Sequence, residues 1–436
     1  MRRLIEKELL AWKEKGKRKP LIVQGVRQCG KTYSIKQFGS EHYADVYYCK
    51  FDEDDTLADF FSPDLNPRRI IRDMSLFRGK DIMPGETLMI FDEIQSCGKA
   101  LASLKYFCEE APEYDIIAAG SLLGVAVPQG TSFPVGKVEF LTLRPMGFYE
   151  FLLAHNEPLA ETLNGSDFGS DVWGTFRSRL EEYLRNYFIV GGMPEAVQAW
   201  IETGSIDEVE RIQKQIIASY ENDFSKHAPL SDFPKISAVW SSIPGQLARE
   251  NKKFFFSRVR KSWRARDLED ALEWLVRAGM VHRVERIEKP GIPVSAYAVP
   301  TSFKLYFADI GILRSLANLP AAAFFEKDSA FREFKGAIAE NYALNELKLA
   351  YDEPIYYWAR EGSSRAEVDF VFQDGMDIVP LEVKAGSAAH AQSLNSYCRQ
   401  YAPKKSVLTS SDDKKNILPL HAFWRIKDWL AGCANG

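Results

Sequence analysis

The residues best suited to chemistry in this chain form one continuous segment, Gly25-Val26-Arg27-Gln28-Cys29-Gly30-Lys31-Thr32, which matches the pattern GxxxxGK(S/T) in full. Glycines let such a loop turn so that successive backbone N–H groups face phosphate oxygens, and the helix that follows adds its positive N-terminus. The lysine neutralises β- and γ-phosphate oxygens, and the next hydroxyl is a ligand for Mg²⁺. Because the apolar run 21–24 precedes the segment as a strand should, we predict that residues 25–32 bind ATP, with Lys31 acting in the chemistry and Thr32 on the metal.

A phosphate-binding loop of this kind also needs an acid at the end of a second strand to hold the metal. The apolar run 88–91 is followed directly by Asp92 and Glu93. Asp92 is expected to hold Mg²⁺ through water, and Glu93 to polarise the attacking water as general base. The glutamate favours a hydrolase over a small-molecule kinase, because a kinase needs no base aimed at water.

A third buried strand, expected at Ile116–Ala119, ends at Gly120 and Ser121. Its position suits a sensor of the γ-phosphate, which would give Ser121 a catalytic role. An ordinary serine at the start of a loop is the alternative. Arg144 and Lys137 are candidates for the cation that stabilises transition-state charge, and each could equally be a surface charge.

A second group of charged residues interrupts apolar strands near the C-terminus. Asp369 lies in the expected strand 368–372, and Glu382 and Lys384 lie in the expected strand 378–384, with Asp374-Gly375 as a hairpin turn between them. Strand side chains alternate, so Glu382 and Lys384 share a face that Asp369 can reach. Two acids with a lysine two residues on resemble the active site of PD-(D/E)XK nucleases.

In such a nuclease site Asp369 and Glu382 would hold Mg²⁺, and Lys384 would orient or activate water beside the scissile phosphate. Glu340, on the preceding helix, matches the extra acid that many of these nucleases place next to the metal. The alternative is a degenerate module that only binds nucleic acid or a partner, with its acids and its lysine paired with each other.

The elements that position these residues predict an α/β protein of four regions. Residues 1–147 alternate strands and helices and predict a P-loop AAA-type core with a central parallel sheet. Residues 148–234 are expected to be a helical lid region. Residues 235–320 predict helices followed by a hairpin with strands at 281–287 and 294–299, the outline of a winged helix. Residues 321–436 predict a restriction-endonuclease-like α/β domain.

One segment has the composition of a nucleic-acid contact. Residues 251–266 contain seven Lys or Arg and no acid, with Phe254–Phe256 and Trp263 interleaved. Such a segment can follow a phosphate backbone. The next helix carries Asp267, Glu269, Asp270 and Glu273, so a solvated face of a structural unit is an equal alternative.

The bulk composition bounds the function further. The net charge of −4 argues against binding nucleic acid by overall charge. The six cysteines include no CxxC, which indicates reduced thiols, and the six scattered histidines form no HxxxH or HExxH pair, so no zinc site is predicted. The amphipathic start and the lack of a long apolar run predict a cytoplasmic protein without a membrane segment.

Several motifs together resemble one family. They are GVRQCGKT, IFDEIQ, IIAAGSLLG, SFPVGKVEFLTLRPMGFYEFL and the turn Gly191-Gly192-Met193-Pro194-Glu195. They resemble prokaryotic AAA-type ATP-binding proteins that carry a C-terminal domain of unknown function, over essentially the whole chain. The resemblance implies that the sensor strand lies between the P-loop strand and the acidic strand. Many relatives have an arginine at the place of Lys137, which weakens the assignment of that cation.

These features lead to one functional expectation and one alternative. The first is a Mg²⁺-dependent ATPase coupled to a nuclease-like C-terminal domain that acts on DNA. The alternative is an ATP-dependent switch whose C-terminal domain is catalytically inactive and only binds nucleic acid or a protein partner. Self-association and the form of the DNA substrate are left open.

Overall fold

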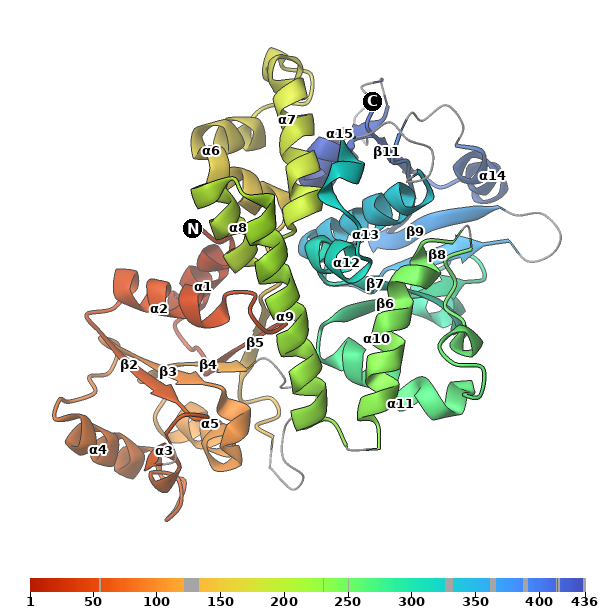
Figure 1. The fold of residues 1–436 in the computed structure, drawn as a ribbon. Coiled ribbons are helices and arrows are strands. Elements are labelled where there is room, and N and C mark those ends of the chain that lie inside the picture. The colour runs from red at the N-terminus through yellow and green to blue at the C-terminus, as the bar shows by residue number, and fades with distance from the viewer. Residues whose placement is uncertain are drawn as a thin grey trace.

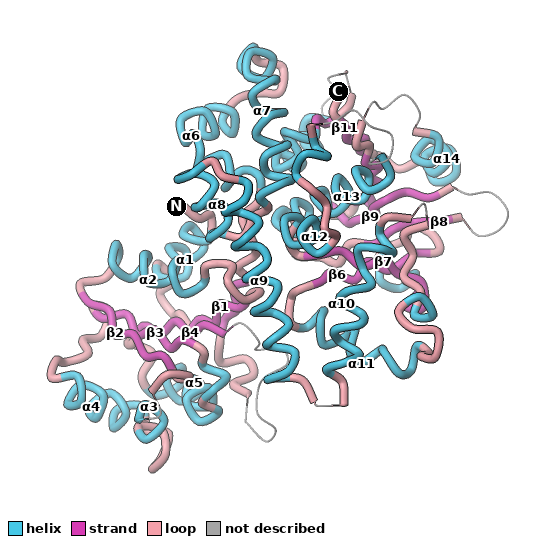
Figure 2. Tube along the Cα trace, viewed as in Figure 1, coloured by secondary structure: helices cyan, strands magenta, loops and turns pink. Residues whose placement is uncertain are grey.

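The computed structural model describes residues 1–54, 56–120, 133–229, 231–249, 251–325, 332–360, 366–386, 391–412, 414 and 416–433. These ranges form an N-terminal sheet and a C-terminal sheet, with a group of long helices between them (Figure 1). Figure 2 shows the strands gathered in two separate layers on either side of this helical group. Within the described ranges, no helix combines the length and the apolar character that a bilayer crossing requires.

The N-terminal sheet consists of β1 (Leu21–Gln24), β2 (Asp45–Lys50), β3 (Thr87–Asp92), β4 (Asp115–Gly120) and β5 (Glu139–Thr142). The strands are parallel and follow the order β2-β3-β4-β1-β5. β4 therefore lies between the loop-bearing strand β1 and the acidic strand β3, as the sequence resemblance implied.

Helices cover both faces of this sheet. α1 (Ile5–Lys13) and α2 (Lys31–His42) lie on one face, and α3 (Thr56–Asp59), α4 (Pro67–Arg78) and α5 (Gly98–Glu110) lie on the other (Figure 1). β3 and β4 are buried along their whole length, which is why they read as continuous apolar runs. Alternate side chains enter different cores: Ile90 packs with α1 and α2, and Met89 packs with α4 and α5.

The helical group begins directly after β5. It contains α6 (Phe148–Gly165), α7 (Asp171–Val190), α8 (Pro194–Thr203), α9 (Ile206–His227), α10 (Phe233–Leu247) and α11 (Ala265–Arg277). α9 runs along the boundary between the two sheets (Figure 1). Its position allows one helix to contact both the nucleotide-binding loop and the C-terminal half.

The C-terminal sheet has the order β12-β11-β10-β9-β8-β6-β7. Its strands are β6 (Val281–Ile287), β7 (Ala298–Phe307), β8 (Tyr356–Ala359), β9 (Glu367–Asp374), β10 (Asp377–Val383), β11 (Val407–Ser410) and β12 (Leu418–Pro419). The helices of this half are α12 (Ile310–Leu316), α13 (Arg332–Ala350), α14 (Gln392–Tyr401) and α15 (Ile426–Cys433).

The hairpin of the predicted winged helix differs from its expected form. Val294–Tyr297 is a short 3-10 helix, and the second strand begins at Ala298 and continues to Phe307. The hairpin also continues the C-terminal sheet, because β6 pairs in parallel with β8. The predicted wing is thus the edge of that sheet. The winged-helix assignment and the four region boundaries stay predictions.

Buried polar contacts join the AAA-type region to α13. The Glu346 carboxylate accepts a hydrogen bond from the Phe148 backbone N–H at 2.7 Å. Burial raises the pKa of Glu346 to about 7, against the effect of this hydrogen bond and with help from the nearby Glu150 charge. Arg144 donates to the Lys348 carbonyl oxygen at 2.9 Å. The two halves are therefore connected by contacts that depend on charge state.

Candidate functional site

The loop between β1 and α2 has two positions whose backbone conformation favours glycine. Gly25 (φ 152°) and Gly30 (φ 93°) both adopt positive φ. A β-carbon on Gly25 would lie 2.0 Å from the carbonyl oxygen of Leu143. The same carbonyl accepts a hydrogen bond from the thiol of Cys29 at 3.3 Å, and Cys29 is fully buried. Because α2 begins at Lys31, its unpaired N-terminal N–H groups lie beside the loop.

Lys31 is held across this loop. Its Nζ donates to the carbonyl oxygens of Gly25 at 2.8 Å and Val26 at 3.0 Å. The side chain is 7% exposed. The ammonium therefore lies within the concave side of the segment whose backbone N–H groups the sequence assigned to phosphate oxygens.

Thr32 and Asp92 meet at the ends of α2 and β3. The Thr32 hydroxyl donates to Asp92 Oδ2 at 2.8 Å, and the Tyr48 hydroxyl donates to the same oxygen at 2.7 Å. Burial, followed by the Asp92 contact, raises the pKa of Tyr48, so the phenol stays neutral and remains a donor. A hydroxyl and a carboxylate are hard oxygen ligands, so this donor pair fits Mg²⁺.

Glu93 follows Asp92 in a left-handed conformation (φ 48°) that a non-glycine residue seldom adopts. Its N–H donates to Asp92 Oδ1 at 3.1 Å, and Gln95 donates to its carboxylate. Glu93 lines a cavity of about 870 Å³ together with Lys31, Thr32 and Asp92. The predicted P-loop and acidic residues are thus brought together on one concavity at the carboxyl edge of the parallel sheet.

The other residues predicted for the nucleotide site either lie away from the cavity or fall outside the described residues. Ser121 lies outside the described residues. Arg144 is largely buried against α13, and burial lowers its pKa. Lys137 is partly exposed and pairs with Glu109 at 2.7 Å. It precedes the first residue of β5 and so lies at the opposite edge of the sheet. Neither cation lines the nucleotide cavity.

Arg3 is a residue of this site that the sequence pattern did not reveal. Its guanidinium donates to the Cys29 carbonyl oxygen at 2.8 Å, to Glu150 at 2.9 Å and to the Arg144 carbonyl oxygen at 2.8 Å. The residue is 7% exposed and lines the cavity. Arg3 and Glu150 lie 147 residues apart, so no local spacing could have paired them.

Arg27 and Gln28 lie at positions of the loop where the GxxxxGK(S/T) pattern allows any residue, and both contact α9. Arg27 forms an ion pair with the buried Asp223, and the Tyr220 hydroxyl donates to the Arg27 carbonyl oxygen at 2.8 Å. Gln28 donates to the Ser219 hydroxyl at 3.3 Å. The predicted phosphate-binding segment is therefore connected, through two side chains and one backbone carbonyl, to the helix between the two halves.

The Gly-Gly-Met-Pro-Glu turn places α8 against the same cavity. The Gly192 N–H donates to Asp309 at 2.6 Å, and the Gly192 carbonyl accepts from the Met146 N–H at 2.7 Å. A β-carbon on Gly192 would lie 2.0 Å from the Met146 carbonyl oxygen, so the close approach requires glycine. Burial raises the pKa of Asp309 to about 6 although backbone N–H groups oppose the shift. Pro194, which follows the turn, lines the cavity.

The C-terminal acids lie together at the meeting point of α13, β9 and β10. Glu340, Asp369 and Glu382 are 4%, 8% and 4% exposed. The Val383 N–H donates to Asp369 at 2.8 Å, and Lys384 Nζ lies 2.6 Å from Glu382 Oε1. Lys384 and Glu382 therefore have the pairing expected for one face of a strand.

Two further lysines enter this cluster from distant segments. Lys252 forms an ion pair with Glu340, which also accepts from the Tyr306 hydroxyl at 3.1 Å. Lys304, 1% exposed, lies 2.5 Å from Glu367. Lys252 and Glu340 are 88 residues apart. The sequence indicated Lys252 only as part of a basic segment and gave no signal for Lys304.

Charge coupling in the cluster shifts the pKa values in opposite directions. Burial raises the pKa of Asp369 far above its usual range, and the charges of Glu340 and Glu382 raise it further. Burial also raises the pKa of Glu382, against the effect of Lys384. For Glu340, burial acts in the same direction, but Lys252 and Lys304 outweigh it and lower the pKa.

The carboxylates of Glu340, Asp369 and Glu382 do not offer ligand atoms that all lie within 4.8 Å of one another. One oxygen of Glu382, Oε2, is buried without a hydrogen-bond partner among the described residues. Buried carboxylate oxygens are suitable ligands for a hard cation. The donor set therefore fits Mg²⁺ in chemistry, and convergence on one ion requires side-chain rearrangement.

Comparison with known proteins divides the chain into three matched regions. Residues 17–152 match the family described as AAA domain, residues 181–323 match domain of unknown function DUF8612, and residues 335–427 match domain of unknown function DUF4143. An uncharacterized protein of Methanocaldococcus jannaschii is 21% identical over 433 residues, which cover 93% of this chain and 87% of that protein.

Two solved structures are also similar. The Walker-type ATPase of Pyrococcus abyssi is 15% identical with a TM-score of 0.44 and covers 71% of this chain and 94% of its own. The ORC1 protein of Aeropyrum pernix in complex with DNA is 12% identical with a TM-score of 0.28, covering 75% and 95%. At such scores these likenesses assign no function, and the assignment rests on the matched family and the loop geometry. Residues 17–152 are accordingly an AAA-type domain of the P-loop ATPase class.

Proposed function

We propose that this protein is a Mg²⁺-dependent ATPase whose AAA-type domain acts together with a nuclease-like C-terminal domain on DNA. The observation that carries the ATPase is the convergence of Lys31, Thr32, Asp92 and Glu93 on one cavity. Each of these side chains has a different role in phosphoryl transfer to water. Lys31 and Thr32 lie at the start of α2, and Asp92 is the last residue of β3, with Glu93 next in the chain.

The residues divide the reaction between binding and chemistry. Backbone N–H groups of residues 25–32 hold the phosphates, and Lys31 exchanges its two carbonyl partners for β- and γ-phosphate oxygens. Thr32 and Asp92 would hold Mg²⁺, which would neutralise phosphate charge when bound. Glu93 accepts a proton from the attacking water, and Gln95 orients the Glu93 carboxylate. Ser121 is assigned to sensing the γ-phosphate.

For the C-terminal domain we propose a metal-dependent phosphodiesterase centre. Asp369 and Glu382, with Glu340 beside them, would hold the cation, and Lys384 would orient the attacking water. The support is the burial of these three carboxylates at one place on the sheet, with Lys384 bonded to Glu382 at 2.6 Å.

A second candidate, an ATP-dependent switch with an inactive C-terminal domain, is favoured by one observation. Lys252, Lys304 and Lys384 each pair with an acid of the cluster or its border. Such pairing can neutralise buried carboxylates without any metal. In this case the cluster would be structural, and ATP would act on domain arrangement.

Two assays on the full-length protein distinguish these candidates. The first measures steady-state phosphate release from ATP with Mg²⁺, with and without DNA. The second measures cleavage of single-stranded, duplex and branched DNA with Mg²⁺ or Mn²⁺. Turnover together with cleavage supports the coupled enzyme. Slow turnover and no cleavage with either metal would leave the switch, and a failure to bind ATP would refute both.

A further inference from the structure

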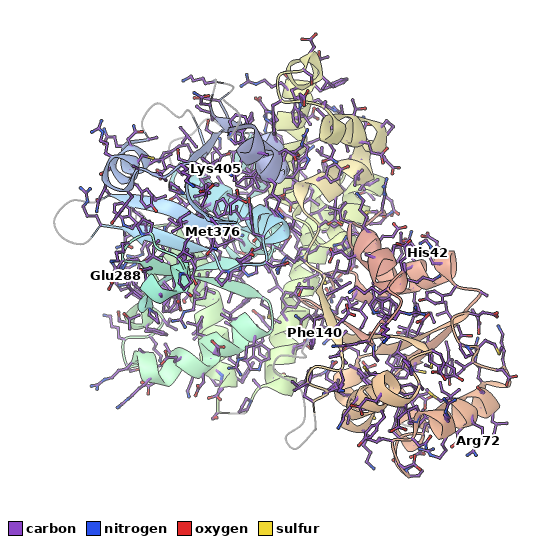
Figure 3. All side chains as sticks on the ribbon, turned by 180° about the vertical axis from the view of Figure 1, so that it is seen from behind. His42, Arg72, Phe140, Glu288, Met376 and Lys405 are labelled. Atoms are coloured by element: carbon purple, nitrogen blue, oxygen red, sulfur yellow. The ribbon has the colours of Figure 1, made fainter. Side chains whose placement is uncertain are left out.

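The far end of α2 carries a group of metal-ligating side chains outside both sites described above. Glu6 on α1 and Glu41 and His42 on α2 each offer one ligand atom, and these three atoms all lie within 4.8 Å of one another. Within the described ranges, this is the one such group of three or more His, Cys, Asp and Glu side chains. Figure 3 labels His42 beside the helices on this face of the N-terminal sheet.

A second observation points to a ligand at this place. A cavity of about 10 Å³ between α1 and α2 is lined by Glu6, Glu41 and Ser34 among others. This volume corresponds to about one water molecule or one ion. Ser34 is only 7% exposed, and its hydroxyl has no hydrogen-bond partner among the described residues. Leaving a buried hydroxyl without a partner is energetically unfavourable.

His42 shows the same feature. Its Nε2 is buried without a hydrogen-bond partner in the described part of the chain, and it lies 3.7 Å from Glu6 Oε1. Lys13 donates to the His42 backbone carbonyl and so fixes the end of the helix. The small cavity is lined by Glu6, Glu41 and Ser34 but not by His42, whose ring offers a nitrogen within 4.8 Å of both carboxylates. One imidazole nitrogen and two carboxylate oxygens at this spacing form a ligand set for one cation.

We propose that Glu6, Glu41 and His42 bind a divalent transition-metal cation of the Zn²⁺ type. One imidazole and two carboxylates are a mixed nitrogen and oxygen set, which suits Zn²⁺ and its neighbours better than Mg²⁺ or Ca²⁺. Three protein ligands leave a fourth position for water.

The charges around the site permit this occupancy. The two carboxylates carry two negative charges, and the cationic side chains that line the adjoining space are Arg2, Arg3 and Lys7. Arg2 is paired with Glu157 and Glu161. The Arg3 guanidinium is already bonded to Glu150 and to two carbonyl oxygens. Glu41 accepts a hydrogen bond from Gln37 at 2.9 Å, and a bound cation would share this carboxylate with Gln37.

The proposed site is separate from the Mg²⁺ site of the ATPase. Thr32 lies at the N-terminal end of α2, and His42 at its C-terminal end, ten residues later. At 1.5 Å per residue the two positions are about 15 Å apart. The metal would connect α1 to the end of the helix that follows the phosphate-binding loop, which makes it a structural clamp and not part of phosphoryl transfer.

The test is metal binding by the full-length protein after removal of metals with a chelator. Calorimetric titration with Zn²⁺ and the visible spectrum of added Co²⁺ are measured for wild type, His42→Asn and Glu6→Gln. Glu8→Gln, on the same helix and with the same charge change, is the matched control, and Asp92→Asn removes the ATPase metal ligand. Circular dichroism checks that every variant is folded, and ATP binding is an additional check for His42→Asn, Glu6→Gln and Glu8→Gln.

We expect one Zn²⁺ equivalent to be lost, or weakened by about 100-fold or more, in His42→Asn and in Glu6→Gln. Glu8→Gln and Asp92→Asn should keep it, and wild type with Co²⁺ should show the absorption of a four-coordinate site that disappears in His42→Asn. Absence of saturable Zn²⁺ binding in wild type would overturn the proposal. Equal binding by wild type and both folded variants would do the same, because it would place the metal elsewhere.

Discussion

Two charged side chains in the nucleotide cavity act at different stages of the proposed reaction. Lys31 contacts phosphate oxygens already in the bound substrate, so its removal affects binding. Glu93 acts on water only as the bond to the γ-phosphate breaks, so its removal affects turnover. The present contacts of Lys31 with two carbonyl oxygens are weak competitors, because phosphate oxygens carry full negative charge.

Lys31→Ala is therefore expected to lower ATP affinity by about 100-fold or more, whereas Glu93→Gln should keep the affinity and lower turnover by about 10²–10⁴-fold. Calorimetry and phosphate release measure the two effects, and Lys105→Ala, on the exposed side of α5, serves as control. Loss of ATP binding in Glu93→Gln, with turnover intact in Lys31→Ala, would reverse both roles.

At the C-terminal cluster, Lys384→Ala is expected to abolish DNA cleavage without weakening metal binding. The substitution removes a cation that lies 2.6 Å from Glu382 and frees that carboxylate for the metal. Mn²⁺ binding by electron paramagnetic resonance and a nuclease assay separate the two effects. Lys405→Ala, which removes a lysine paired with Asp374 in the same domain, should cleave normally. Cleavage by Lys384→Ala at the wild-type rate would exclude its catalytic role.

At the scale of elements, the contact between α6 and α13 depends on one buried carboxyl group. Glu346 has a pKa of about 7 in the folded protein, against 4.5 as its ordinary value. Between these values the folded state holds a proton that the unfolded chain has released. The Glu346 contribution to the free energy of unfolding is therefore complete below pH 4.5 and is lost as the pH rises through 7.

Glu346→Gln is expected to remove this loss, because glutamine still accepts the Phe148 N–H but does not ionise. As the pH rises from 5 to 8, the free energy of unfolding of the variant should increase relative to that of wild type by up to roughly 3 kcal/mol. Denaturant unfolding at the two pH values measures the difference, and Asp309 titrates equally in both proteins. A constant difference between variant and wild type over this range would show that Glu346 is already ionised at pH 5.

The sequence predicted the strands that carry the phosphate-binding loop, the acidic pair and the expected sensor to within one residue at each end. Leu21–Gln24 and Val281–Ile287 have the expected bounds. The second hairpin strand was missed beyond residue 299 because Pro300, Thr301 and Ser302 interrupt its apolar pattern. Its Lys304 is buried because acids of β9 and α13 surround it. Likewise, the pairing of Arg3 with Glu150 depends on the whole fold, which no local spacing encodes.

At the scale of the molecule, α9 connects the nucleotide loop to the C-terminal half. Its residue Asp223 pairs with Arg27. Towards its other end, Glu210 and Gln213 bond to Arg314 of α12 at 2.9 and 2.7 Å, and Arg314 is 1% exposed. We propose that these charge-assisted contacts let a change at the nucleotide loop reach the C-terminal half through α9.

ATP with Mg²⁺ is expected to protect residues 25–32, 88–93 and α9 from hydrogen exchange. At a hundredfold excess over Kd, binding adds roughly 2.7 kcal/mol to the unit that binds. Asp223→Asn should keep protection of the first two segments and lose it along α9, whereas Glu221→Gln, two residues away on an exposed position, should match wild type. Protection of α9 that survives in Asp223→Asn would exclude the ion pair as the connection. Protection that extends to residues 367–384 would favour the switch.

The rate at which the Cys29 thiol reacts can report how often the nucleotide loop opens. Cys29 is fully buried and bonded to the Leu143 carbonyl, so an alkylating reagent reaches it only while the loop is open. The rate at which this one sulfur is modified, followed by mass spectrometry, therefore counts opening events. Oxidants would reach the thiol by the same route. They would therefore inactivate protein molecules that have no nucleotide bound and spare those that have one.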